Sequence, residues 1–109
     1  MPGVIVELGP DTWDKNVSDA KGLIVVYFWG PACGHCTMFS PIFEAAAAEA
    51  GDRAVFAKVN CTEHISVAID CGIRGTPTVL IYKDGEVVDR HVGAETKEAL
   101  VKRITDLLA

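Results

Sequence analysis

The chain has 109 residues, of which 50% are hydrophobic and 23% are charged, and this balance predicts one globular domain over residues 1–109. Its formal net charge of −5 argues against a general role on nucleic acid or on an anionic membrane surface. No apolar stretch approaches the roughly 20 residues that a membrane-spanning helix needs, so a membrane protein is not expected.

The first half of the chain alternates strand and helix patterns. A short strand is expected at Val4–Val6, and a helix over Pro10–Ala20, where apolar residues recur four apart. Leu23–Trp29 is a continuous run of apolar, β-branched and aromatic residues, which predicts a strand buried on both faces. A longer helix is expected over Cys33–Ala50 because it contains four consecutive alanines, and Gly51 is its expected stop.

The second half adds a strand, a short helix, a hairpin and a last helix. The hairpin turn is expected at Asp84-Gly85, because that dipeptide favours a type I′ turn. Thr96 is expected to cap the last helix, since its hydroxyl can accept a hydrogen bond from the first turn. In chain order the expected elements are a strand at Ala54–Val59, a helix at Glu63–Cys71, strands at Thr78–Lys83 and Glu86–Val92, and a helix after Thr96.

This order of elements predicts an α/β fold. Strands that alternate with helices favour a mostly parallel sheet, here of about five strands, with helices on both faces and antiparallel pairing added by the final hairpin. Functional sites in such sheets lie beyond the carboxyl ends of the strands. Cys33 stands at that position, after the central buried strand and at the start of a helix.

The segment Cys33-Gly34-His35-Cys36 is a C-x-x-C motif. Its two cysteines lie three apart, so they are neighbours on one face of a helical turn and their sulfurs can bond or separate with little backbone movement. The free N–H groups and the dipole of the helix start should stabilise the Cys33 thiolate and lower its pKa, which makes it the expected nucleophile. Cys36, one turn further in, is the expected resolving thiol.

Two other interpretations of the cysteines stay open at this stage. The C-x-x-C pair is also half of a zinc site, although the spacing of all four cysteines does not match familiar ligand patterns. Cys61 and Cys71 are either buried thiols that act as small apolar residues or a second, redox-sensitive pair near the same surface. A Cys61–Cys71 disulfide is therefore a hypothesis.

The chain resembles the thioredoxin family over nearly its whole length. The resemblance rests on Phe28-Trp29, Pro41, residues 57–60, residues 72–78, residues 83–86 and residues 92–94. It implies a thioredoxin fold in which Pro77 follows a cis peptide bond and faces the disulfide, while the backbone of Thr76 pairs with extended substrate chains. The remaining substrate-contacting positions that it implies are Trp29, Ala32, Gly75 and Gly93.

Three positions depart from the family pattern. The dipeptide Gly34-His35 is that of protein disulfide isomerase, and a charged imidazole near Cys33 would stabilise the thiolate and make the disulfide a stronger oxidant. Ala32 stands where both families carry Trp, which makes the substrate platform smaller. Tyr27 stands where both carry a buried acid, although Lys58, the usual neighbour of that acid, is retained; these residues are expected to tune the redox chemistry.

The expected function is thiol–disulfide exchange with protein substrates through a mixed disulfide. No bound cofactor is expected, and the resemblance implies a flavin-dependent reductase as the source of electrons. The chain is expected to be a monomer. The first residues lack the basic, apolar and small-residue pattern of a signal peptide, which favours a cytoplasmic location. The rival hypothesis is a non-catalytic module that holds a partner on the same surface.

Overall fold

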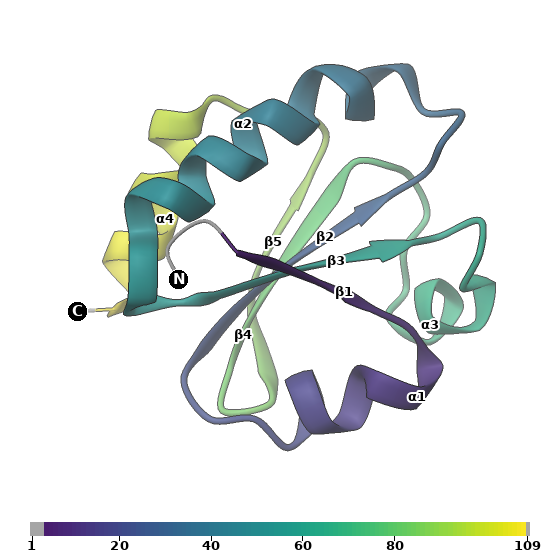
Figure 1. The fold of residues 1–109 in the computed structure, drawn as a ribbon, viewed down its shortest axis with the longest axis horizontal. Coiled ribbons are helices and arrows are strands. Elements are labelled where there is room, and N and C mark those ends of the chain that lie inside the picture. Colours follow the sequence, from purple (N-terminus) through teal and green to yellow (C-terminus); the bar gives the residue numbers. More distant parts are fainter. Residues whose placement is uncertain (1–3, 109) are drawn as a thin grey trace.

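The computed structural model describes residues 4–108, whose centre is a five-stranded sheet in the order β1-β3-β2-β4-β5 (Figure 1). The strands are β1 (Ile5–Leu8), β2 (Leu23–Trp29), β3 (Val55–Asn60), β4 (Thr78–Lys83) and β5 (Glu86–Val92). The expected bounds of β2, β4 and β5 are confirmed, whereas β1 and β3 each begin one residue later and end beyond the expected residue. The expected number of about five strands in one sheet is confirmed.

Two of the strand pairs are parallel and two are antiparallel, which corrects the expectation of a mostly parallel sheet. β3 pairs in parallel with β1 and β2, while β4 pairs antiparallel with both β2 and β5. The cause is the segment between β3 and β4, which stays at the carboxyl edge of the sheet and does not cross its face. β4 therefore enters the sheet at the edge where β2 ends, with Thr78 opposite Phe28.

The α-helices are α1 (Pro10–Trp13), α2 (Gly34–Ala50), α3 (Ile65–Asp70) and α4 (Lys97–Leu108), joined by the short helices η1 (Asp14–Ser18) and η2 (Gly51–Arg53). The helix expected over Pro10–Ala20 is thus a single α-turn followed by the π-helix η1. The Asp19 N–H donates to the Asp14 carbonyl at 2.8 Å, one residue further back than in an α-helix. Residue periodicity does not distinguish these two hydrogen-bonding patterns over so short a segment.

The two faces of the sheet carry separate cores, because successive strand side chains point to opposite faces. Val25 and Tyr27 join the core beneath α2 and α4, whereas Val26 and Phe28 join the core beneath α1 and α3. Figure 1 shows the same division, with α2 and α4 on one side of the sheet and α1 and α3 on the other. Helices on both faces, as expected, therefore bury β2 completely up to Trp29.

The hairpin turn at Asp84-Gly85 and the helix cap at Thr96, both predicted from the sequence, are present in the structure. Asp84 and Gly85 have φ angles of 51° and 87°, as a type I′ turn requires. A Cβ at position 85 would lie 2.4 Å from the Ser18 carbonyl oxygen, so only glycine fits this close approach. The Thr96 hydroxyl accepts the Ala99 N–H at 3.1 Å and caps α4. Within residues 4–108, no helix is both long and apolar enough to cross a membrane.

Candidate functional site

Cys33 is placed at the junction between β2 and α2 by a tight turn. Its N–H donates to the Gly30 carbonyl at 3.2 Å, and helical geometry begins only at Gly34, so Cys33 is the N-cap residue and not the first helical residue. The Cys33 sulfur accepts the Cys36 backbone N–H at 3.1 Å. A disulfide joins Cys33 to Cys36, whose Cα atoms lie 5.2 Å apart.

The two sulfurs of the pair have very different access to solvent. Cys33 is partly exposed, whereas Cys36 is 2% exposed and packs with Phe39 and Val79 in the core beneath α2. Gly34 and His35 between them are exposed. A substrate therefore reaches Cys33 and not Cys36.

Strand register brings the loop before β4 to the same edge. Thr78 pairs with Phe28 on one side and with Val92 on the other, and the Gly93 N–H donates to the Pro77 carbonyl at 2.8 Å. The Thr76–Pro77 peptide bond is cis, which confirms that expectation. The carboxyl ends of β2 and β5 and the start of β4 thus converge on one edge.

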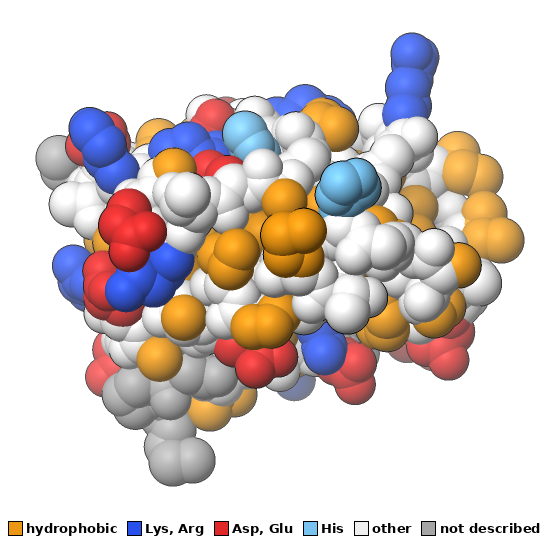
Figure 2. Space-filling model, turned by 90° about the horizontal axis from the view of Figure 1, so that it is seen from above, with side chains coloured by type: hydrophobic (Ala, Val, Ile, Leu, Met, Phe, Trp, Pro, Cys, Tyr) orange, Lys and Arg blue, Asp and Glu red, His pale blue; other side chains and the backbone are white. Residues whose placement is uncertain are grey.

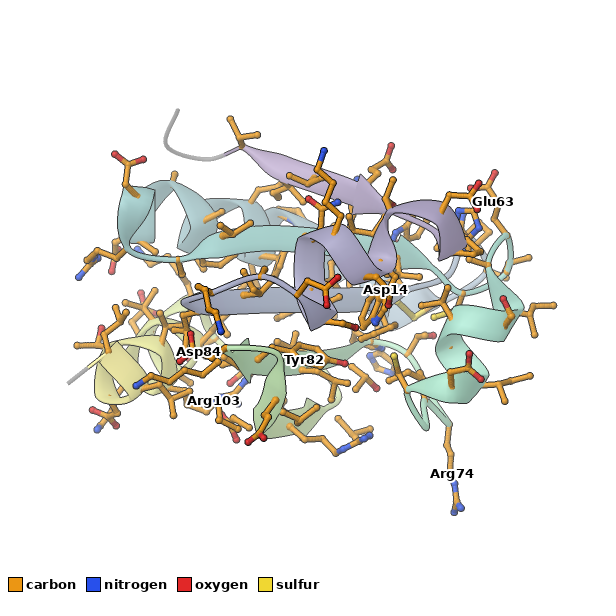
Figure 3. All side chains as sticks on the ribbon, turned by 90° about the horizontal axis from the view of Figure 1, so that it is seen from below. Asp14, Glu63, Arg74, Tyr82, Asp84 and Arg103 are labelled. Carbon is orange, nitrogen blue, oxygen red and sulfur yellow. A yellow bond between two sulfur atoms is a disulfide. The ribbon has the colours of Figure 1, made fainter. Side chains whose placement is uncertain are left out.

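The surface at this edge is mostly apolar or neutral. Met38 and Val92 are each 63% exposed, and Ala32 is also exposed. Figure 2, which looks onto the α2 side, shows a central area of orange and white, with acidic and basic side chains mainly around its border. Arg74, in the loop before Pro77, extends alone into solvent (Figure 3).

The hydroxyl of Tyr27 reaches from β2 into the turn of α2 that carries Cys36. It donates to the Cys36 carbonyl at 3.2 Å and lies 3.0 Å from the Ser40 hydroxyl, which itself donates to the Cys36 carbonyl at 2.8 Å. Burial raises the pKa of Tyr27, although the hydrogen bond with Ser40 opposes the shift. Ser40 was not singled out from the sequence, although its position four residues after Cys36 could have indicated it.

Lys58 does not bond to Tyr27, although the two residues are paired in register on β3 and β2. Its ammonium lies 3.7 Å from a Glu7 carboxylate oxygen and 5.6 Å from the centre of the Trp29 ring. The Trp29 indole N–H is buried and has no hydrogen-bond acceptor among the described residues.

A cavity of about 70 Å³ lies between the sheet and α2, and we call it the α2 cavity. Its polar lining consists of Tyr27, Trp29, Ser40, Glu44 and Lys58, and Ile5 and Phe43 complete it. The sequence had indicated three of the polar residues separately, but Glu44 and Ser40 enter the site only through the helix packing.

Cys61 and Cys71 are free thiols, each partly buried against the core beneath α1 and α3. The Tyr82 hydroxyl lies 3.7 Å from the Cys71 sulfur. Burial raises the pKa of both thiols, and the neighbouring Cys71 raises that of Cys61 further. The structure shows no bond between them, so their pairing stays a prediction. Within residues 4–108, no group of three or more His, Cys, Asp or Glu side chains is arranged to hold a metal ion.

Comparisons with known proteins agree with this geometry. Residues 4–106 match the family model described as Thioredoxin. A protein named Thioredoxin from Chlorobaculum thiosulfatiphilum is 39% identical over 97 residues, which cover 85% of this chain and 90% of the relative. The crystal structure of Malassezia sympodialis thioredoxin (Mala s 13), described as a member of a pan-allergen family, superposes with a TM-score of 0.89 at 33% identity, covering 100% of this chain and 96% of that one.

Proposed function

Because the chain belongs to the thioredoxin family and is a thiol–disulfide oxidoreductase, we propose that Cys33 is its attacking thiol and Cys36 its resolving thiol. One observation carries this assignment of roles. The partly exposed Cys33 sulfur caps α2 and accepts the N–H of a cysteine that is itself 2% exposed. A thiolate at Cys33 is stabilised by this N–H and by the helix dipole, whereas Cys36 has no access to a protein substrate.

The reaction takes place in two exchange steps. The Cys33 thiolate attacks one sulfur of a substrate disulfide, which forms a mixed disulfide and releases the other substrate sulfur as a thiolate that takes up a proton. Cys36 then loses its proton and attacks the Cys33 sulfur, which releases the second substrate thiol. The substrate disulfide has gained two electrons, and the Cys33–Cys36 disulfide is the oxidised product.

We propose that Gly34-His35 makes this disulfide more oxidising than that of a Gly-Pro thioredoxin, as in the protein-disulfide-isomerase type of motif. His35 is exposed beside Cys33 at the helix start. A charged imidazole there favours the thiolate and therefore the reduced form. Tyr27 and Lys58 act on the other side of the pair, where Tyr27 holds the Cys36 carbonyl.

Substrates are proposed to bind along the edge where β2, β4 and β5 meet. The backbone of Gly75 and Thr76, ahead of Pro77, offers hydrogen bonds to an extended chain, and Gly93 lies beside them through its bond to the Pro77 carbonyl. Ala32 and the partly exposed Trp29 flank the disulfide on the other side. The small Ala32 leaves room for bulkier substrate segments than a Trp would.

Thioredoxins act on protein disulfides and are reduced by a thioredoxin reductase. For this chain we propose a flavin-dependent reductase, a monomeric state, a cytoplasmic location and a single domain over residues 1–109. One sheet with a core on each face supports the single domain. We also propose that the disulfide needs no bound cofactor, since each step exchanges electrons between sulfurs only.

Insulin reduction with dithiothreitol as the electron source tests the function. We expect turnover with the wild-type chain, none with Cys33→Ser, and a trapped mixed disulfide with Cys36→Ser. A wild-type chain that binds partners but does not turn over would instead support the non-catalytic binding module.

A further inference from the structure

The α2 cavity lies beside the helical turn that carries the resolving cysteine, because two of its lining residues bond to the Cys36 carbonyl. Its most buried polar lining residue is Tyr27, which is 2% exposed, whereas Glu44 is exposed. The hydroxyls of two lining residues, Tyr27 and Ser40, both donate to the Cys36 carbonyl. The cavity therefore begins at the helical turn of the resolving thiol and opens beside a carboxylate.

The same path follows one row of side chains on α2. Cys36, Ser40 and Glu44 stand at intervals of four residues, so they are successive neighbours on one helix face. Helical side chains lean toward the amino terminus, which tilts Glu44 toward Ser40 and Ser40 toward Cys36. The 2.8 Å bond from the Ser40 hydroxyl to the Cys36 carbonyl shows this tilt directly.

Water fits this cavity in both size and chemistry. A volume of about 70 Å³ exceeds the roughly 10–15 Å³ that one water needs. The buried Trp29 N–H lacks an acceptor among the described residues, and buried polar groups in proteins are almost always hydrogen-bonded. A water in the cavity has the Trp29 N–H as donor and the hydroxyls of Tyr27 and Ser40 as further partners.

The charged and titratable groups that line the cavity differ in whether they can take a proton. Tyr27, from β2, remains protonated because burial raises its pKa. Lys58, from β3, is paired with Glu7 of β1 and lies over the face of Trp29. Glu44, from α2, is the one carboxylate of the lining.

We propose that Glu44 accepts, through water in the α2 cavity, the proton that Cys36 loses when it attacks the mixed disulfide. The Cys36 thiol gives its proton to water, and the water passes a proton to the Glu44 carboxylate. The Cys36 sulfur bonds to the Cys33 sulfur while the bond from Cys33 to the substrate sulfur breaks. The substrate leaves as a thiolate that is protonated by solvent, and Glu44 returns its proton to solvent.

This inference rests on the proposed roles of Cys33 and Cys36, and Glu44→Gln tests it separately from them. The variant keeps the shape of an exposed side chain, so the fold is retained. Glu49→Gln is the control, because it lies on the same helix, changes the charge equally and does not line the cavity, although it also removes the ion pair with Lys97. Rapid acid quench of reduced protein with a protein disulfide measures both the formation and the lifetime of the mixed disulfide.

We expect Glu44→Gln to leave formation unchanged and to lengthen the lifetime about tenfold at pH 6–7, since positioned bases accelerate such steps by large factors. The difference should shrink toward pH 9, where a thiol ionises without help. Glu44→Asp should recover part of the rate, and Glu49→Gln should match wild type. A wild-type lifetime in Glu44→Gln, or equal slowing in Glu49→Gln, would overturn this proposal alone. Absence of any mixed disulfide would overturn the proposed cysteine roles as well.

Discussion

Replacing Tyr27 by Asp should speed the resolving step and weaken the fold at the same time. The introduced carboxyl would lie on β2 and line the same cavity, nearer to the sheet than the tyrosine hydroxyl that it replaces. A carboxylate there can accept the thiol proton, whereas the tyrosine hydroxyl cannot, because burial raises its pKa. We expect the lifetime of the mixed disulfide near pH 7 to fall several-fold.

The cost in stability follows from what the Tyr27 ring contacts. Its centre lies 5.2 Å from that of Phe39 and 5.0 Å from that of Phe43, and the residue is 2% exposed. Truncating a buried aromatic residue costs about 3–5 kcal/mol of unfolding free energy. Desolvation of the carboxylate adds to this cost and raises the pKa of the new group above its unfolded value. The added cost therefore is absent at low pH and appears as pH rises through the folded pKa.

Tyr27→Phe is the matched control, because it removes only the hydroxyl. Ser40 still donates to the Cys36 carbonyl, so we expect a loss of about 1 kcal/mol and an almost unchanged lifetime. Urea unfolding at pH 5 and pH 8 measures the stabilities, and rapid quench measures the lifetimes. An unchanged lifetime in folded Tyr27→Asp would refute the reasoning and leave Tyr27 as a packing residue.

Three further predictions concern the cysteines and His35. Limiting iodoacetamide at mildly acidic pH should label reduced Cys33 before Cys36, and preferential labelling of Cys36 would reverse their roles. The reduction potential of the Cys33–Cys36 disulfide should lie between about −270 mV, the value for thioredoxin, and about −180 mV, the value for protein disulfide isomerase, a span of roughly 4 kcal/mol. His35→Pro should make this potential more negative. A wild-type potential below the thioredoxin value, or no shift in the variant, would contradict the role of His35. Because burial raises the pKa of Cys61 and Cys71, the alkylation of these thiols should accelerate only as pH rises above about 9. If Cys61 and Cys71 pair on mild oxidation of the reduced protein, the number of free thiols falls by four. A fall of two would exclude the pairing.

Much of the fold was predictable because its signals are local. The continuous apolar run of β2, the Asp84-Gly85 turn and the Thr96 cap each depend on neighbouring residues, and each was found where expected. The place of Cys33 at the end of a buried strand was predictable for the same reason. The π-helical turn after Trp13 was missed, because one residue of extra hydrogen-bond spacing leaves no distinct pattern over five residues.

The sequence by itself thus determined the elements, the strand-to-helix position of Cys33-Gly34-His35-Cys36 and the chemistry that two such thiols can perform. Only the tertiary structure decided the contacts between residues far apart in the chain. It turned β4 antiparallel to β2 and placed the Lys58 ammonium beside Glu7, although Lys58 is in register with Tyr27. It also brought Ser40 and Glu44 to a cavity beside the helical turn of the resolving thiol. The physical reason is that these contacts depend on how α2 packs against the sheet, and helix packing is set by the whole core and not by the residues next to each position in the chain.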